Sequence, residues 1–137
     1  MIHGIGTDLV KVSRIESSLQ RFGVRFAERI LAPDERSAFA AHADPVRFLA
    51  KRFAAKEAFG KALGTGVAVP ATLHAVSVTH DARGRPGFRY AARLAEHMAC
   101  HGLSAHLSLS DELDYVVAFA VVERTHSIEG SDCSELS

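Results

Sequence analysis

The chain has 137 residues, and its sixteen basic and sixteen acidic side chains leave no formal net charge at neutral pH. This length fits one domain with a real core, and the apolar fraction of 47% is ordinary for a soluble globular protein. Balanced charge argues against a nucleic-acid binder and against a membrane-surface protein, so any basic surface must be local. The start, MIHGIGTDLV, lacks the segments of a secretory signal, and no apolar run approaches membrane-spanning length. We therefore expect a cytoplasmic protein.

A strand is predicted over residues 2–10, where β-branched residues alternate with small ones. Ile2, Gly4, Gly6 and Asp8 then share one side, because successive side chains of a strand point to opposite faces. Glycine has no side chain that could pack against the core, so two glycines on one side of a strand indicate a close approach by a ligand or by another backbone.

A basic helix is predicted next. Ser13 with Glu16 three residues later has the form of a capping box, so the helix should begin near Arg14. Arg21 and Arg25 continue a basic stretch that phenylalanine and leucine interrupt. Taken alone, this stretch is compatible with a solvated helix face.

A long helix is predicted in the middle of the chain, after a short one over residues 32–43. Asp44 suits the cap position and Pro45 the first helical position. The helix should end near Gly64 or Gly66, because glycine accepts the left-handed conformation that closes helices.

The second half of the chain mixes strands and a helix without regular alternation, which favours an α+β fold with an antiparallel sheet and packed helices. One domain is expected over residues 1–124, followed by a polar, frayed tail over 125–137. The expected elements are a strand at 74–80, a turn at 81–87, a helix at 92–102, and strands at 104–110 and 115–124.

The stretch RFAAKEAFGKALGTG, residues 52–66, places charge on an apolar helix. Glu57 and Lys61 lie almost opposite the main apolar stripe, yet their neighbours Ala50, Phe53 and Ala54 are apolar too. A helix that is apolar on both sides is usually buried or sandwiched, which would put the two charges in a crevice or at a subunit boundary. The simpler interpretation is an exposed i,i+4 pair that stabilises the helix by about 0.2–0.5 kcal/mol.

Residues from three other segments could lie close to Glu57 and Lys61 in the folded chain. Asp8 and Glu57 together suit a hard cation such as Mg²⁺, although Asp8 alone is also compatible with a turn or cap. His106 shares one side of its strand with Ser108 and Ser110, as on the wet side of an amphipathic strand. The Gly64-Thr65-Gly66 loop offers unobstructed N–H groups for a phosphate, but helix termination is a sufficient explanation.

Three segments together, MIHGIGTDLVKVSRIE, RFAAKEAFGKALGTG and HLSLSD, closely resemble the small holo-acyl-carrier-protein synthases, a family of 4′-phosphopantetheinyl transferases. The resemblance runs from Met1 to about Arg124. It implies a compact α+β protein that forms trimers with active sites at the subunit boundaries. It also implies transfer of the phosphopantetheine arm of coenzyme A to a serine of apo-acyl carrier protein, in support of fatty acid biosynthesis, with release of adenosine 3′,5′-bisphosphate.

The resemblance also assigns roles by position. It implies that Asp8 and Glu57 hold Mg²⁺ and that Lys61 reaches the diphosphate of coenzyme A. Acidic carrier proteins would dock on arginines of the first helix, and the nucleotide and its 3′-phosphate would lie among a further set. The docking candidates are Arg14, Arg21 and Arg25, and the nucleotide set is Arg52, Gly64, Thr65, Gly66 and His106.

Two alternatives stay open at this stage. One is a related Mg²⁺-dependent transferase that serves a carrier domain of a polyketide or peptide synthetase. The other is a module without catalytic activity that binds coenzyme A or an acidic protein. Asp8, Glu57 and Lys61 argue against the second alternative, because simple binding would not demand a metal pair.

Overall fold

The computed structural model describes residues 1–125. The expected tail, apart from Thr125, lies outside the described residues, so the domain boundary at Arg124 stays a prediction. Twelve elements follow one another along the described chain, and η marks a 3₁₀ helix. They are β1 (Ile2–Lys11), α1 (Val12–Phe22), α2 (Val24–Ile30), η1 (Pro33–Glu35), α3 (Arg36–Ala41), α4 (Pro45–Leu63), η2 (Leu73–Ala75), β2 (Val76–His80), β3 (Pro86–Tyr90), α5 (Ala92–Cys100), β4 (Leu103–Asp111) and β5 (Tyr115–Arg124).

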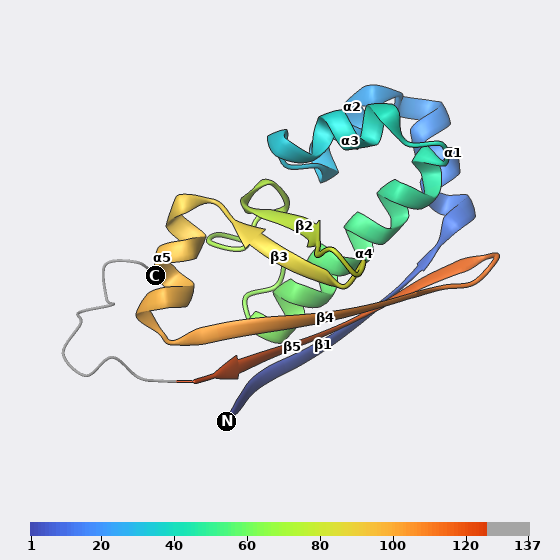
Figure 1. Cartoon of the computed structure of the whole chain (residues 1–137). Coiled ribbons are helices and arrows are strands. Elements are labelled where there is room, and N and C mark those ends of the chain that lie inside the picture. Colours follow the sequence, from blue (N-terminus) through green and yellow to red (C-terminus); the bar gives the residue numbers. More distant parts are fainter. Residues whose placement is uncertain (126–137) are drawn as a thin grey trace.

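Two antiparallel sheets and one central helix organise the fold. The larger sheet has the strand order β1-β5-β4, and β2 pairs with β3 in a separate hairpin. Helix α4 packs across one face of the larger sheet, with α1, α2 and α3 gathered around its first half (Figure 1). The expected α+β class with an antiparallel sheet is confirmed. Within residues 1–125, none of the helices combines the length and hydropathy needed to cross a membrane.

The glycines of β1 let α4 lie directly on the strand. A Cβ atom on Gly4 would stand 2.0 Å from the carbonyl oxygen of Ala62, and one on Gly6 would stand 2.2 Å from that of Ala58. No side chain fits into such a gap. The approaching group that the sequence pattern indicated is therefore the backbone of α4, and the strand and helix that carry Asp8 and Glu57 are held in close contact.

Both ends of α4 lie where the sequence predicts them. The Asp44 carboxylate accepts a hydrogen bond from the Arg47 N–H at 3.1 Å, which caps the first turn. At the other end Gly64 adopts φ = 95° and closes the helix. The main apolar stripe of the helix, which includes Phe48 and Phe59, is buried.

The predicted start of α1 is wrong. The helix begins at Val12 rather than near Arg14, and no side chain caps it, so Ser13 is not the N-cap. The N–H of Val12 donates instead to the carbonyl oxygen of Asp114, at 2.9 Å, in the link between β4 and β5. A distant backbone group satisfies the helix terminus, which the local capping pattern did not reveal.

Strand β3 was not predicted from the sequence, whose pattern indicated a turn as far as Gly87. The turn itself is formed by residues 81–85, where the Asp81 carboxylate accepts from the N–H groups of Arg83 and Arg85. Pro86 then opens the strand, a position where proline costs no ladder hydrogen bond. The strand is short and lacks clear alternation, so only its pairing with β2 defines it.

Candidate active site

Asp8, Glu57 and Lys61 meet at the free edge of β1. Asp8 faces α4 from the strand, while Glu57 and Lys61 come from successive turns of the helix. The Lys61 ammonium donates to the Thr7 carbonyl oxygen at 2.8 Å and lies 3.3 Å from Asp8 Oδ1. Lys61 therefore pairs across to the strand, and the simple i,i+4 pair with Glu57 does not form.

Glu57 is left without a hydrogen bond or ion pair among residues 1–125. Burial raises the pKa of its carboxyl, the negative charge of Asp8 raises it further, and Lys61 opposes both effects. The ionised form of two neighbouring carboxylates is unfavourable when one of them is partly buried and unpaired, unless a cation binds to them. Two partly exposed carboxylates are a donor set that fits a hard divalent cation such as Mg²⁺, which completes its coordination with water or phosphate oxygens.

The loop after α4 folds back over the helix end. The N–H groups of Gly64 and Gly66 both donate to the carbonyl oxygen of Gly60, at 3.0 and 2.9 Å, and the Thr65 hydroxyl donates to Gly66 O. The helix-terminating interpretation of this loop is thus confirmed. Within residues 1–125, the N–H groups of Gly64 and Gly66 are already hydrogen-bonded, and that of Thr65 is not. The Thr65 N–H is therefore the group of this loop that is available to a ligand.

Arg52 lies on the other side of α4 from Glu57 and Lys61. Its Nη1 donates to Glu35 Oε2 at 2.7 Å and to the carbonyl oxygen of Val78, and its guanidinium stacks 4.4 Å above the centre of the Phe48 ring. Within one chain Arg52 does not join the carboxylate pair. It lines a separate cavity of about 270 Å³, whose wall also contains His42, Arg47, Lys51 and His80.

His106 is also separate from the carboxylate pair in a single chain. It is on the outer face of the larger sheet, the face that α4 does not cover, and its Nε2 lies 2.9 Å from Glu123 Oε1. Ser108 and Ser110 share that face, as the alternation predicts, whereas Leu107 and Leu109 point toward α4. Asp8 points toward α4 as well, so the sheet separates it from His106.

The basic residues of the first helices surround a hollow. Arg21, Phe22, Arg25, Phe26 and Arg29 line a surface depression of about 340 Å³ over α1 and α2. Phe22 is 56% exposed, and the Arg21 guanidinium lies 5.1 Å from its ring centre. Arg14 is exposed about two turns before Arg21 on α1, outside the depression. Gly23, with φ = 65°, separates the two helices that carry these arginines.

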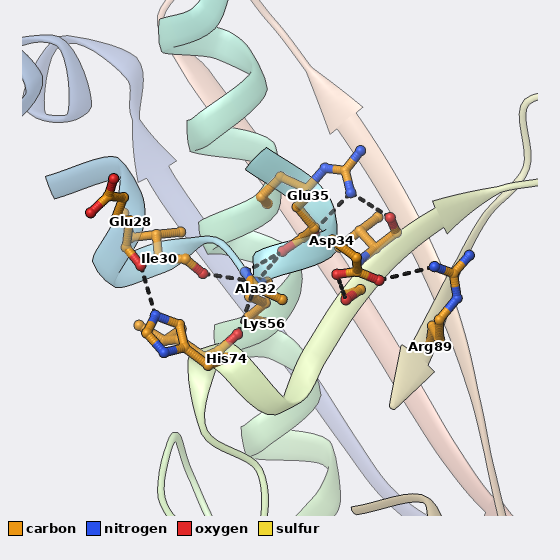
Figure 2. A network of polar contacts seen from close by, with 12 residues as sticks. Glu28, Ile30, Ala32, Asp34, Glu35, Lys56, His74 and Arg89 are labelled. Atoms are coloured by element: carbon orange, nitrogen blue, oxygen red, sulfur yellow. Dashed lines mark hydrogen bonds and ion pairs between the residues drawn. The ribbon is translucent and has the colours of Figure 1, made fainter. Parts of the chain in front are cut away.

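Glu35 and Lys56 form a buried ion pair that the sequence did not predict. Both are almost completely buried, at 3% and 1% exposure, and their side chains are 2.5 Å apart (Figure 2). A lysine on the apolar face of a helix is the signal that was available, because a buried ammonium needs an acidic partner. The sequence could not show which acidic residue pairs with Lys56, because Glu35 belongs to a different element.

Comparison with known proteins identifies the family of this chain. A family model described as the 4′-phosphopantetheinyl transferase superfamily matches residues 4–120. The chain belongs to this superfamily. Within it, the chain is 68% identical to a protein of Aromatoleum aromaticum named holo-acyl-carrier-protein synthase, over 90% of this chain and 99% of that relative. A protein of the same name from Azoarcus is 69% identical, over 90% and 98% of the two chains.

Solved structures of superfamily members share the fold. The holo-acyl-carrier-protein synthase of Neisseria meningitidis superposes with a TM-score of 0.87 at 48% identity, covering 90% of this chain and 99% of that one. The synthase of Bacillus anthracis, whose crystal structure is a complex with coenzyme A (3′,5′-ADP), gives a TM-score of 0.78 at 35% identity, covering 91% and 99%. The expected phosphopantetheinyl transferase fold is confirmed.

Proposed function

We propose that this protein is a holo-acyl-carrier-protein synthase, which transfers the 4′-phosphopantetheine group of coenzyme A to a serine of apo-acyl carrier protein. The observation that carries the proposal is the cluster of Asp8, Glu57 and Lys61 at the edge of β1, in a chain so similar to proteins of that name. The products are holo-acyl carrier protein and adenosine 3′,5′-bisphosphate. The reaction supports fatty acid biosynthesis and takes place in the cytoplasm.

Asp8 and Glu57 hold Mg²⁺ in this proposal. When bound, the metal stabilises the negative charge of the diphosphate. Lys61 would interact with the diphosphate as well. Its ammonium is held by the hydrogen bond to the Thr7 carbonyl oxygen and by the ion pair with Asp8, and its side chain is still 52% exposed. Such a cation is available to a phosphate oxygen and can stabilise charge that develops during phosphoryl transfer.

The nucleotide end of coenzyme A is assigned to Arg52, to the Gly64-Thr65-Gly66 loop and to His106. The cavity beside Arg52 supports this assignment, because it is lined by several cationic or titratable side chains that suit an anionic ligand. The Thr65 N–H is the group of the loop that remains for a phosphate.

A homotrimer would unite these parts. His106 and Arg52 do not reach Asp8 in one chain, so a site that contains all of them requires a second copy. The outer face of the larger sheet supports association, because Ile5, Leu9, Val117 and Phe119 form exposed apolar rows across β1 and β5, each 40–63% exposed. An antiparallel sheet whose outer face meets only water normally carries polar residues there.

The acidic carrier protein is assigned to the basic surface of α1 and α2. Arg21 and Arg25 flank the exposed Phe22 in the depression, which gives this surface both charge and an apolar centre. Arg14 extends the charge along α1. Complementary charge mainly accelerates association and selects the partner.

Intact-mass analysis tests the proposed function directly. An acidic apo-acyl carrier protein is incubated with this protein, coenzyme A and Mg²⁺, and a parallel sample contains EDTA. The expected result is a mass gain of one phosphopantetheine group that EDTA abolishes. A mass gain that is equal with and without EDTA would contradict the metal assignment, and no gain with any of several verified apo-carriers would contradict the transferase itself.

A further inference from the structure

Glu35 stands at the centre of a buried polar network that the proposed reaction does not use. Its Oε1 accepts from the Ala32 N–H at 2.9 Å and from the Lys56 ammonium, and its Oε2 accepts from the Val78 N–H at 3.0 Å and from Arg52 (Figure 2). Burial by itself would raise the pKa of Glu35, but the charge of Lys56 and these hydrogen bonds outweigh burial and lower it. Glu35 is therefore a fully paired carboxylate.

Lys56 completes the network on the far side of Glu35. Besides the carboxylate, its ammonium donates to the carbonyl oxygens of Ile30 and Leu73, at 2.8 and 2.9 Å, so all three of its protons are used. Lys56 thus has no capacity left for a ligand. Its charge allows Glu35 to stay ionised in the interior, where an unpaired carboxylate would be costly.

Arg52 shares the 270 Å³ cavity with two other strong cations, Arg47 and Lys51. Arg47 is already bound by Asp111 and by the carbonyl oxygens of Glu112 and Leu113, and Lys51 also pairs with Asp111. Arg52 uses only Nη1 for its contacts in the described part of the chain. Its Nη2 and Nε remain for an anion, while Glu35, Val78 O and the Phe48 ring hold the guanidinium in place.

We propose that Glu35 is a positioning residue for coenzyme A: it orients the Arg52 guanidinium at the cavity wall so that the free nitrogens face an anionic group of the bound molecule. This inference rests on the proposed function. It predicts that Glu35 acts on coenzyme A binding through Arg52 and has no direct effect on the carrier protein. A residue that serves only the stability of the fold would not show that selectivity.

Glu35→Gln is the first test, because the amide keeps the shape and removes the charge. The expected result is a rise of about tenfold in the KM and the Kd for coenzyme A, with the KM for the carrier protein unchanged. Asp34→Asn is the matched control, since Asp34 is the adjacent carboxylate but binds Ser77 and Arg89 instead of α4. That variant should bind coenzyme A like the wild type.

A double-mutant cycle separates positioning from stability. In an Arg52→Gln background, Glu35→Gln should change the KM for coenzyme A less than twofold, because the residue through which it acts is gone. Independent, multiplied effects of the two substitutions would overturn the inference, and so would a Glu35→Gln variant that loses thermal stability but keeps the wild-type KM.

A second variant covers the case in which Glu35→Gln does not fold. Glu35→Gln with Lys56→Met removes both buried charges together, which buried pairs tolerate far better than the loss of one partner. This variant should fold and still bind coenzyme A about tenfold more weakly, whereas wild-type affinity would overturn the inference. The transfer activity of the wild type, measured alongside the variants, tests the proposed function separately. A wild type without transfer activity would contradict that function, whatever the variants show.

Discussion

Gly6 of β1 lies directly against Ala58 of α4, so closely that a Cβ atom on Gly6 would stand 2.2 Å from the Ala58 carbonyl oxygen and 2.8 Å from the Ala62 nitrogen. The obstructing atoms belong to the helix backbone, which cannot rotate away as a side chain can. Because Asp8 follows Gly6 on the same face of the strand, this contact also sets the separation between the two candidate metal ligands.

Gly6→Ala should therefore reduce both stability and activity. We expect a loss of about 1–3 kcal/mol in the free energy of unfolding, because overpacking pushes the strand away from the helix. Urea denaturation and the Mg²⁺ dependence of transfer measure the two effects. Gly87→Ala is the control, since its new Cβ atom would lie 3.4 Å from the Thr79 hydroxyl oxygen, an ordinary contact. Equal stability of the two variants would contradict the close packing.

Glu57→Gln should abolish metal-dependent transfer and yet stabilise the metal-free protein at neutral pH. The raised pKa of Glu57 means that the fold favours the protonated carboxyl, so its ionisation at neutral pH is destabilising. The gain in Tm over the wild type, measured in EDTA, should shrink as the pH falls and vanish below about pH 4, where the carboxyl is protonated in the unfolded chain as well. A variant with undiminished turnover would show that Glu57 is not a metal ligand.

Lys61→Met should lower turnover with little change in stability. The ammonium is half exposed, so its pair with Asp8 contributes little to folding. Removing a preorganised cation from a phosphoryl-transfer site typically costs roughly a hundredfold in kcat. Single-turnover kinetics measure the step, and Lys11→Met, at the exposed end of β1, is the control. If both variants turn over alike, Lys61 has no role in the reaction.

Arg21→Glu combined with Arg25→Glu should weaken recognition of the carrier protein. We expect a rise of about tenfold or more in its KM, less pronounced at high salt, with the KM for coenzyme A unchanged. Arg93→Glu is a control for charge reversal elsewhere, because Arg93 is exposed on α5, at the opposite end of the molecule from α1 and α2 (Figure 1). An equal effect of the control would indicate general electrostatic attraction rather than docking at the depression.

Phe119→Asp should convert the proposed trimer to monomers. Phe119 lies in the middle of the apolar outer face, between Thr7 of β1 and Ser108 of β4. A carboxylate there would be buried without a partner on association. Sedimentation velocity measures the change, and Leu113→Asp, at the 83% exposed tip of the β4–β5 hairpin, is the control. A monomeric variant with full activity would argue against a site shared between copies.

Local rules made much of the fold predictable. Asp44, Pro45 and Gly64 mark the ends of α4 because capping, proline geometry and left-handed glycine depend on a few consecutive residues. Alternation placed His106, Ser108 and Ser110 on one face of β4 for the same reason. The capping pattern at Ser13 failed because a carbonyl from a distant link satisfies the helix terminus, and β3 exists through its pairing with β2 rather than through a pattern of its own.

The sequence by itself determined the family, the order of most elements and the residue types of the candidate site, since these depend on motifs and local periodicity. Only the tertiary structure decided which charges meet. Lys61 pairs with Asp8 rather than with Glu57, and Arg52 and Lys56 share Glu35 in the interior. Such partners are far apart in the chain, and the packing of α4 on β1 and against the segment after α2 brings them within hydrogen-bonding distance.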